Sequence, residues 1–389
     1  MKMISSKYTI REQNKANILA TIIENQEISR ADISTITGLN KASVSEITKE
    51  LLEQEYIFET RVGKASTVGG RKPILLTFNP QAALVISIDL GTDYIEGMLA
   101  YIDGEVIKYL SKKEIVVTKE KVSESIKKII HGFEKIAPTT PHGIVGITLA
   151  IHGIVSQNKI LFTPNYNLNQ MDLLTELKDI PYPIYLQNEA NLAALGEYTF
   201  TSSSDNLVSI SIHSGIGAGI VQDGLLILGK NGEAGEIGHS ILYPDGKACP
   251  CGNHGCLEQY ASNLALYQEF RNELKLQSCH SDIVAKLWHE NNHVAKTILL
   301  KNVHHLSIAI NNVIMAFSPE VIVINSSIYR KIPDLIDYIQ NNLPSQFAQD
   351  LVIRNTHLQN RAILFGGFAK AAQEFLHIQN LKLTLKEFK

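Results

Sequence analysis

Apolar residues in the first 55 positions recur three and four residues apart and predict three short helices. The first helix covers residues 11–25. Ser29 is placed to cap a second helix over residues 30–37, and Gly38 to end that helix in a tight turn. The third helix runs through Leu52, and its inward-facing residues are Val44, Ile47, Leu51 and Leu52. Short helices around one tight turn are typical of a helix-turn-helix unit.

Polar residues at the start of the third helix, and a basic segment after it, favour DNA as the partner of this region. Strands are predicted over residues 56–59 and 74–78, with the basic segment 61–73 between them as the wing of a winged helix. A recognition helix enters the major groove by its N-terminal turns, and a wing contacts phosphates or the minor groove. The candidate DNA-binding residues are therefore Asn40, Lys41, Ser43, Ser45, Arg71 and Lys72. A three-helix protein-interaction module and a solvated linker would show the same patterns, so both alternatives stay open.

The rest of the chain contains two similar strand patterns about 120 residues apart. In the first, a buried strand from Val85 reaches a glycine turn at Gly91, and strands over residues 94–100 and 105–110 follow. In the second, residues 207–217 lead into a strand over 218–222 and another over 225–228. Such a repeat suggests two similar lobes, whose glycine turns could cradle phosphates across a cleft.

Composition places few limits on function. Hydrophobic residues make up 44% of the chain, and 389 residues predict two or three domains. The N-terminus lacks the apolar core of a signal peptide and no run of eighteen apolar residues occurs, so we expect a cytoplasmic protein without a membrane partner. The formal net charge is −3, whereas the first 75 residues hold 11 Lys and Arg against 9 Asp and Glu. This small positive excess permits DNA binding without requiring it.

The cysteines make the most specific chemical demand. The chain has four, and three of them lie within eight positions, ten residues after a histidine. Thiolates and an imidazole are the ligands that tetrahedral Zn²⁺ prefers, and a complete set of four indicates a structural site. The predicted zinc ligands are His239, Cys249, Cys251 and Cys256. A disulfide, an accidental cluster and a redox pair are the alternatives, and the odd number of clustered cysteines argues against the first.

Several motifs together resemble the ROK family (repressors, open reading frames and sugar kinases). They are Asp89-Leu-Gly91-Thr92, Asn188-Glu189-Ala-Asn191, Gly215-Ile-Gly217, Glu236-Ile-Gly238-His239 and the cysteine motif that ends at Glu258. The N-terminal region is similar to that of the repressor branch of this family. The segment Phe162-Thr163-Pro164-Asn165 is most like that of the xylose repressors of Gram-positive bacteria.

The resemblance implies an α/β fold, in which a winged helix-turn-helix precedes a two-lobed actin-like (ribonuclease-H-like) domain. We divide the chain into residues 1–78, a first lobe over 79–195, and a second lobe over 196–389 with the zinc loop and closing C-terminal helices. The resemblance also implies a homodimer or dimer-paired tetramer, and a monosaccharide effector bound in the cleft. The implied sugar-binding residues are Asn165, Asn188, Glu189, Glu236, His239 and Glu258.

Four departures from the kinase pattern favour a sensor over an enzyme. Glu189 replaces the aspartate that serves as general base, and His213 replaces the first glycine of the second phosphate turn. Residues 323–327 lack the glycines expected beside adenosine, and His152 replaces a proline. We therefore expect a repressor that senses xylose or a related sugar and binds operator DNA. An ATP-dependent sugar kinase with an accessory DNA-binding domain is the alternative. Gly366 and Gly367 are expected to start the closing C-terminal helix.

Overall fold

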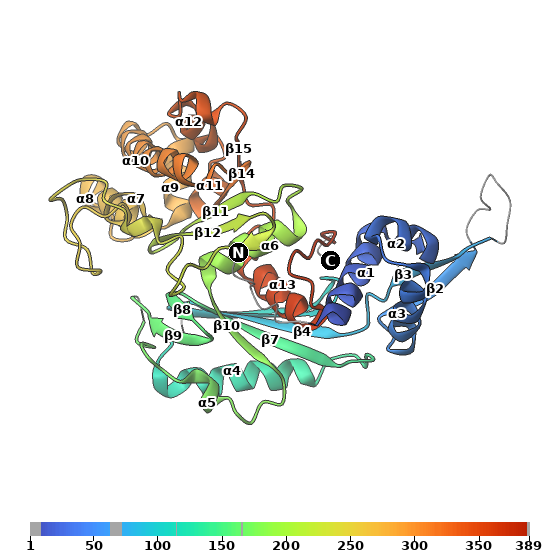
Figure 1. Cartoon of the computed structure of the whole chain (residues 1–389). Helices are drawn as coiled ribbons and strands as arrows, with labels where there is room; N and C mark the ends of the chain where they lie inside the picture. The colour runs from blue at the N-terminus through green and yellow to red at the C-terminus, as the bar shows by residue number, and fades with distance from the viewer. Residues whose placement is uncertain (1–8, 63–71, 114, 165, 387–389) are drawn as a thin grey trace.

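The computed structural model describes residues 9–62, 72–113, 115–164 and 166–386. Its N-terminal domain contains α1 (Ile10–Asn25), α2 (Arg30–Thr37) and α3 (Lys41–Glu53), followed by the antiparallel strands β2 (Ile57–Val62) and β3 (Ile74–Phe78). Gly38 ends α2 with a φ of 71°, as the turn prediction required. This domain projects from one side of the molecule (Figure 1). The three predicted helices and both strands are confirmed.

One strand of this domain was missed. Residues Ile28–Ser29 form β1, which pairs antiparallel with β3 and completes a sheet of order β1-β3-β2. A strand of two residues is too short to leave a recognisable alternation in the sequence. A smaller difference concerns Leu52, which is only partly buried although the helical pattern placed it inward.

The body of the molecule contains two five-stranded sheets with the same topology. The first has the order β10-β7-β4-β5-β6 and the second β13-β12-β11-β14-β15. In each sheet, three consecutive strands pair antiparallel and two later strands join in parallel. The first set of strands is β4 (Leu84–Leu90), β5 (Tyr94–Tyr101), β6 (Val106–Lys113), β7 (Ile144–Ile151) and β10 (Ile184–Asn188). The second is β11 (Leu207–Ile212), β12 (Ile216–Gln222), β13 (Leu225–Leu226), β14 (Val321–Asn325) and β15 (Val352–Asn355). The duplicated two-lobed fold is confirmed.

Helices cover the outer face of each sheet. On the first lobe, α4 (Lys119–Glu134) packs its apolar side against the sheet, and α5 (Leu173–Glu176) and the hairpin β8 (Ile154–Ser156) with β9 (Lys159–Phe162) lie nearby. The second lobe is covered by a group of helices at the top of Figure 1. They are α7 (Glu258–Ala261), α8 (Asn263–Leu274), α9 (Ser281–His289), α10 (His293–Phe317), α11 (Ser327–Lys331) and α12 (Leu335–Asn341), with the single turns η1 (Ile237–His239) and η2 (Gln346–Ala348). Within the described residues, no helix is both long enough and apolar enough to cross a bilayer.

Two helices, α6 (Glu189–Phe200) and α13 (Ala362–Leu376), lie between the sheets and contact each other closely. Glycines allow this approach. A Cβ on Gly366 would overlap the carbonyl oxygen of Leu192, and one on Gly196 would lie 2.6 Å from the carbonyl oxygen of Ala362. Gly366 and Gly367 were expected to begin the C-terminal helix, whereas they lie in its interior, where their missing side chains serve packing.

The two central helices pack on different sheets. α6 packs on β11 and β12 of the second sheet, whereas α13 packs on β4 and β7 of the first. The proposed boundary between residues 195 and 196 falls inside α6, and α13, which the sequence assigned to the second lobe, packs on the first sheet. The order of the elements along the chain gives no sign of this arrangement. The packing favours a division that assigns α13 to the first lobe.

Replacement of Gly366 by alanine is expected to destabilise the protein strongly, because the added methyl group would force the two central helices apart. Overpacking of a tight helix crossing costs about 1–3 kcal/mol, and more where backbone must move. Gly132→Ala is the matched control, since Gly132 lies in helix α4 with open space around its Cα. That variant should be stabilised by about 0.5–1 kcal/mol. Equal midpoints of urea unfolding for both variants would contradict the proposed role of the crossing.

Candidate functional site

The N-terminal half of α3 presents the predicted DNA-contacting side chains. Asn40, Lys41 and Ser45 are exposed, and Ser43 is half-buried. Asn40 also caps the helix, because its Oδ1 accepts a hydrogen bond of 2.9 Å from the backbone N–H of Ser43. This cap positions the start of the helix, a role that the polar pattern alone did not distinguish from DNA contact.

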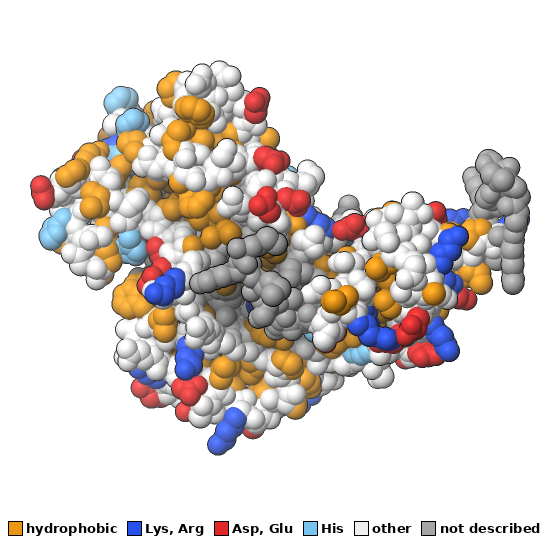
Figure 2. Space-filling view, viewed as in Figure 1, with side chains coloured by type: hydrophobic (Ala, Val, Ile, Leu, Met, Phe, Trp, Pro, Cys, Tyr) orange, Lys and Arg blue, Asp and Glu red, His pale blue; other side chains and the backbone are white. Residues whose placement is uncertain are grey.

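Most described basic residues of the N-terminal domain are paired with carboxylates. Arg11 lies 3.0 Å from Glu46 and 3.1 Å from Glu50, which ties α1 to α3. Similar pairs join Arg30 to Glu59 and Arg61 to Glu27. Basic and acidic side chains accordingly alternate over this domain in Figure 2.

Two predicted DNA-binding cations lie outside these pairs. In the described ranges, Lys41 and Lys72 make no ion pair, and both are exposed. They therefore remain available to phosphates. The predicted contact Arg71 lies outside the described residues.

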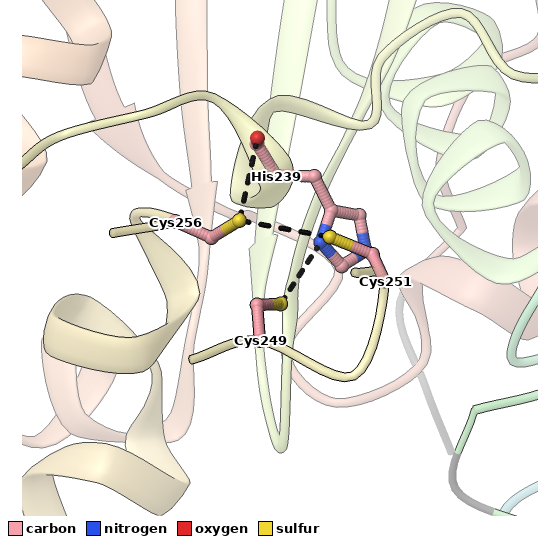
Figure 3. A group of neighbouring side chains, drawn as sticks. All are labelled: His239, Cys249, Cys251 and Cys256. Carbon is pink, nitrogen blue, oxygen red and sulfur yellow. Dashed lines mark hydrogen bonds between the residues drawn. The ribbon is translucent and has the colours of Figure 1, made fainter. Parts of the chain in front are cut away.

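The four predicted metal ligands come together in the second lobe (Figure 3). Their ligand atoms all lie within 4.8 Å of one another. Nδ1 of His239 is 3.5 Å from Sγ of Cys249, and the sulfurs of Cys251 and Cys256 are 3.7 Å apart. Gly255 has a φ of 76° and no room for a Cβ beside the Tyr243 carbonyl, so the loop needs glycine there to fold back. This cluster could hold one tetrahedral metal ion.

A cleft between the lobes contains the predicted sugar-binding residues. An inner cavity of about 70 Å³ opens beside an outer pocket of about 570 Å³. The two share five lining residues: Pro164, Ser214, Gly215, His239 and Glu258. Asn188, Glu189 and Glu236 line the inner cavity, whereas Asn165 lies outside the described residues.

Asn188 is largely committed to positioning its neighbours. Its side chain caps α6 by accepting from the N–H of Asn191 at 3.0 Å, and its Nδ2 donates to the carbonyl of Gly153 and to Oε2 of Glu189. Glu189 is therefore fixed at the N-terminus of α6, at the edge of the cavity. Burial raises the pKa of Glu189, since the charged carboxylate loses water.

Among the predicted sugar-binding residues that the structure describes, Glu236 has the most available acceptor atoms. Its carboxylate makes no hydrogen bond within the described part of the chain, although it lines the inner cavity. Burial and the carboxylates of Glu189 and Glu258 raise the pKa of Glu236 to about 7. Glu258 instead lies against the metal cluster, 3.3 Å from Sγ of Cys249 and 3.7 Å from Nδ1 of His239.

Sequence reasoning missed a buried network on the opposite wall of the cavity. Nε2 of His152 lies 2.9 Å from Oδ1 of Asp89, and the hydroxyl of Tyr94 donates to Oδ2 of Asp89 at 2.9 Å. Burial lowers the pKa of His152, but Asp89 and Glu189 outweigh it and raise the pKa to about 9. His152 was noted only as a lost proline, because Asp89 is 63 residues away in the sequence.

Both glycine turns of the cleft differ from open phosphate cradles. In the first, the ring of Tyr94 covers Gly91 so closely that a Cβ there would overlap it. In the second, His213 lines the cavity, and burial, together with His152, lowers the pKa of His213 to about 4. Nε2 of His213 is buried without a partner among the described residues. Beyond β14, Ser326 caps α11 in place of a glycine-rich turn.

Residues 85–374 match the ROK family, and residues 11–57 match a winged helix-turn-helix DNA-binding family. The chain belongs to the ROK family. It is 32% identical to the xylose repressor of Bacillus subtilis over 90% of this chain and 91% of that protein. It is 33% identical to the xylose repressor of Caldicellulosiruptor bescii over 94% of this chain and 97% of that one.

Solved structures support the same assignment. A crystal structure of a ROK family transcriptional regulator, a homologue of the Escherichia coli MLC protein, has a TM-score of 0.83 at 28% identity. It covers 95% of this chain and 99% of that chain. A ROK glucokinase from Streptomyces griseus has a TM-score of 0.66 at 22% identity and covers 75% of this chain and 99% of its own, which shows the shared fold of the body alone.

Purified protein is expected to contain about one zinc ion per chain, because three thiolates and an imidazole converge on one point. Cys251→Ser should reduce the metal content and lower the melting temperature, since it removes one of four ligands. Cys279→Ser is the control, because Cys279 lies apart from the cluster. Elemental analysis of undenatured, chelator-free protein measures the effect, and metal-free wild-type protein would refute the site.

Proposed function

We propose that this protein is a sugar-responsive transcriptional repressor that binds operator DNA and senses a monosaccharide, xylose or a related sugar. The observation that carries the proposal is the identity of 32–33% to two xylose repressors over at least nine-tenths of the chain. That similarity includes both the winged helix and the lobes. A protein acting on operator DNA in a bacterium works in the cytoplasm, which we propose as its location.

The DNA-binding proposal is supported by the arrangement of α3. Its N-terminal turn is exposed, capped and polar, which suits entry into the major groove. We infer that Asn40, Lys41, Ser43 and Ser45 face the bases or nearby phosphates. We further propose that Arg71 and Lys72 of the wing contact the DNA backbone.

The sugar-binding proposal is supported by the chemistry of the inner cavity. Sugar hydroxyls both donate and accept hydrogen bonds, so carboxylates and amides can recognise them in pairs. Glu189, Glu236 and Glu258 supply acceptors there, and Asn188 fixes the first of them. We propose Asn165 as a further contact from the neighbouring loop. His239 connects the cavity with the metal cluster, because its Nδ1 faces the cysteines and leaves Nε2 for a ligand.

We infer that the metal is structural zinc. All four ligand positions are supplied by the protein, which leaves no open position for catalysis. Bound zinc would fix the ring of His239 and the loop that contains Glu258. The metal would thus support the sugar site from outside the cavity.

We propose that the protein has no kinase activity. Phosphoryl transfer depends on positioned phosphates and charge stabilisation, so it requires open nucleotide turns. The ring of Tyr94 over Gly91, and His213 in the second turn, argue against phosphate binding at either place. The body of the chain shares its fold with a ROK glucokinase, so an ATP-dependent sugar kinase is the alternative to be tested.

A route by which sugar could affect the winged helix is present in the packing. Glu189 begins α6, and α6 packs against α13. The far end of α13 reaches the N-terminal domain, where the rings of Phe375 and Tyr56 lie 5.5 Å apart. His142 stacks 4.5 Å from Tyr56 and hydrogen-bonds the carbonyl of Gln54. Movement of α6 on sugar binding would therefore reach the DNA-binding domain through α13.

We propose a homodimer, or a tetramer of paired dimers, as the working form. Winged helices commonly bind two half-sites as a symmetric pair. Helix α10 carries exposed apolar residues on one side, which favour contact with a second copy. They are Leu300, Ile308 and Met315.

Binding to an operator selected from a random DNA library is expected to weaken steeply as salt rises, because phosphate contacts release counterions. Arg71→Ala should weaken binding to all sequences and reduce the salt slope by about one. Ser45→Ala should instead relax base preference at one position of each half-site. Fluorescence anisotropy measures both effects. Specific binding by a protein that lacks residues 1–78 would show that the DNA-binding domain is wrongly assigned.

Glu236→Ala is expected to weaken binding of D-xylose about ten- to a hundred-fold, because it removes a carboxyl acceptor that is worth about 1.5–3 kcal/mol in its ionised form. The variant should still bind operator but release it only at higher sugar concentration. Calorimetry measures the first effect and anisotropy the second. Wild-type protein should bind the sugar without ATP and form no sugar phosphate in a coupled assay. Turnover at an ordinary kinase rate would overturn the sensor proposal.

A further inference from the structure

The inner cavity is rich in carboxylate acceptors. The carboxylates of Glu189, Glu236 and Glu258 accept hydrogen bonds, and Nδ2 of Asn188 is used within the protein. A sugar hydroxyl that donates to a carboxylate still has lone pairs, which need an N–H or O–H donor in a closed site. A ligand of this cavity therefore requires donors that the acidic residues cannot provide.

His152 lies on the opposite wall of the inner cavity, and its ring is held in a position to donate. Its Nε2 is taken by Asp89 at 2.9 Å and lies 3.3 Å from the hydroxyl of Tyr94. Its backbone is fixed as well, because the hydroxyl of Tyr166 accepts from its N–H at 2.9 Å. Nδ1 has no partner among the described residues, and the side chain, 13% exposed, lines the inner cavity. The ring is thus held from one side and open on the other.

We propose that His152 is a specificity-determining residue of the sugar site, which donates its Nδ1–H to a ligand hydroxyl while Asp89 and Tyr94 position the ring. This inference rests on the proposed sugar-binding function. Asp89 and Tyr94 are positioning residues, since they act through His152. The ring of Tyr94 also covers the first glycine turn, because it lies against Gly91. A turn that could cradle phosphate would here serve recognition of a neutral hydroxyl.

The charge state of the ring decides whether Nδ1 donates or accepts. With Nε2–H bonded to Asp89, Nδ1 carries a proton only in the imidazolium form. The pKa of about 9 keeps that form at neutral pH, and a hydroxyl accepting from Nδ1–H raises it further. The contribution of this contact to sugar affinity is therefore fully present well below pH 9, and it is lost as the pH rises through that value.

Other titratable groups also face His152. Burial raises the pKa of Tyr94 and of Tyr166 beyond the range of the experiment, and that of His213 is lowered to about 4. Burial also raises the pKa of Glu189, which faces His152 from α6. A variant without the imidazole separates the remaining titrations from that of His152.

Calorimetric titration of the full-length protein with D-xylose tests the proposal. For wild-type protein, affinity should be about threefold weaker at pH 9.5 than at pH 7.5, the factor expected when a group with a pKa near 9 contributes about tenfold to affinity. His152→Gln should weaken binding about tenfold at pH 7.5 and remove this pH dependence. His131→Gln, an exposed histidine on α4, is the matched control and should behave as wild type.

Asp89→Asn gives a readout that a merely structural role would not produce. Loss of the carboxylate should move the decline in affinity to lower pH, because the imidazolium form is no longer stabilised. His152→Gln with wild-type affinity and an unchanged pH profile would overturn the proposal. Wild-type protein that binds operator but no xylose or related pentose would instead contradict the proposed function itself. Zinc content and operator affinity, measured on each variant, exclude misfolding as the cause.

Discussion

The close crossing of α6 and α13 is the constraint on which the rest of the structure depends. Backbone atoms meet at the crossing point, because Gly196 and Gly366 leave room for the carbonyls of Ala362 and Leu192. Each helix also packs on a different sheet, so the pair connects two lobes that share no strand in the part of the chain that the structure describes. A larger residue at the crossing would separate the sheets as well as the helices. Tight packing of this kind transmits displacement rather than absorbing it.

Both ends of α6 are fixed by polar contacts. Asn188 caps its N-terminus and orients Glu189 toward the cavity. Lys382 donates to the carbonyls of Tyr198, Ser202 and Ser204 at the other end, where a cation also suits the helix dipole. Any ligand that contacts Glu189 therefore acts on a helix held at both ends and packed along its length. Coupling between the cleft and the winged helix requires only that the sugar prefer one of two positions of this unit.

The sequence predicted features that local patterns specify. Three helices and a glycine turn defined the DNA-binding domain, and cysteine spacing predicted the four side chains that converge in the second lobe. Features that depend on distant residues were missed. The pairing of His152 with Asp89 spans 63 positions, and the position of Tyr94 over Gly91 depends on backbone conformation. Packing of α13 on the first sheet likewise has no local signal. Helix caps were predicted only in part. Asn40 was predicted as a polar DNA contact, and its role as the cap of α3 was not.

The charges in the cavity favour a neutral polyhydroxyl ligand over a phosphorylated one. Burial raises the pKa of both Glu189 and Glu236, and repulsion from the carboxylate of Glu189 raises that of Glu236 further. Hydroxyl groups that donate to these carboxylates would relieve that repulsion. A phosphate would add negative charge to it, and the glycine turn that could cradle the group is covered by Tyr94. For the proposed sugar sensor, the substitutions that would oppose nucleotide binding would therefore also suit the cleft to an unmodified sugar.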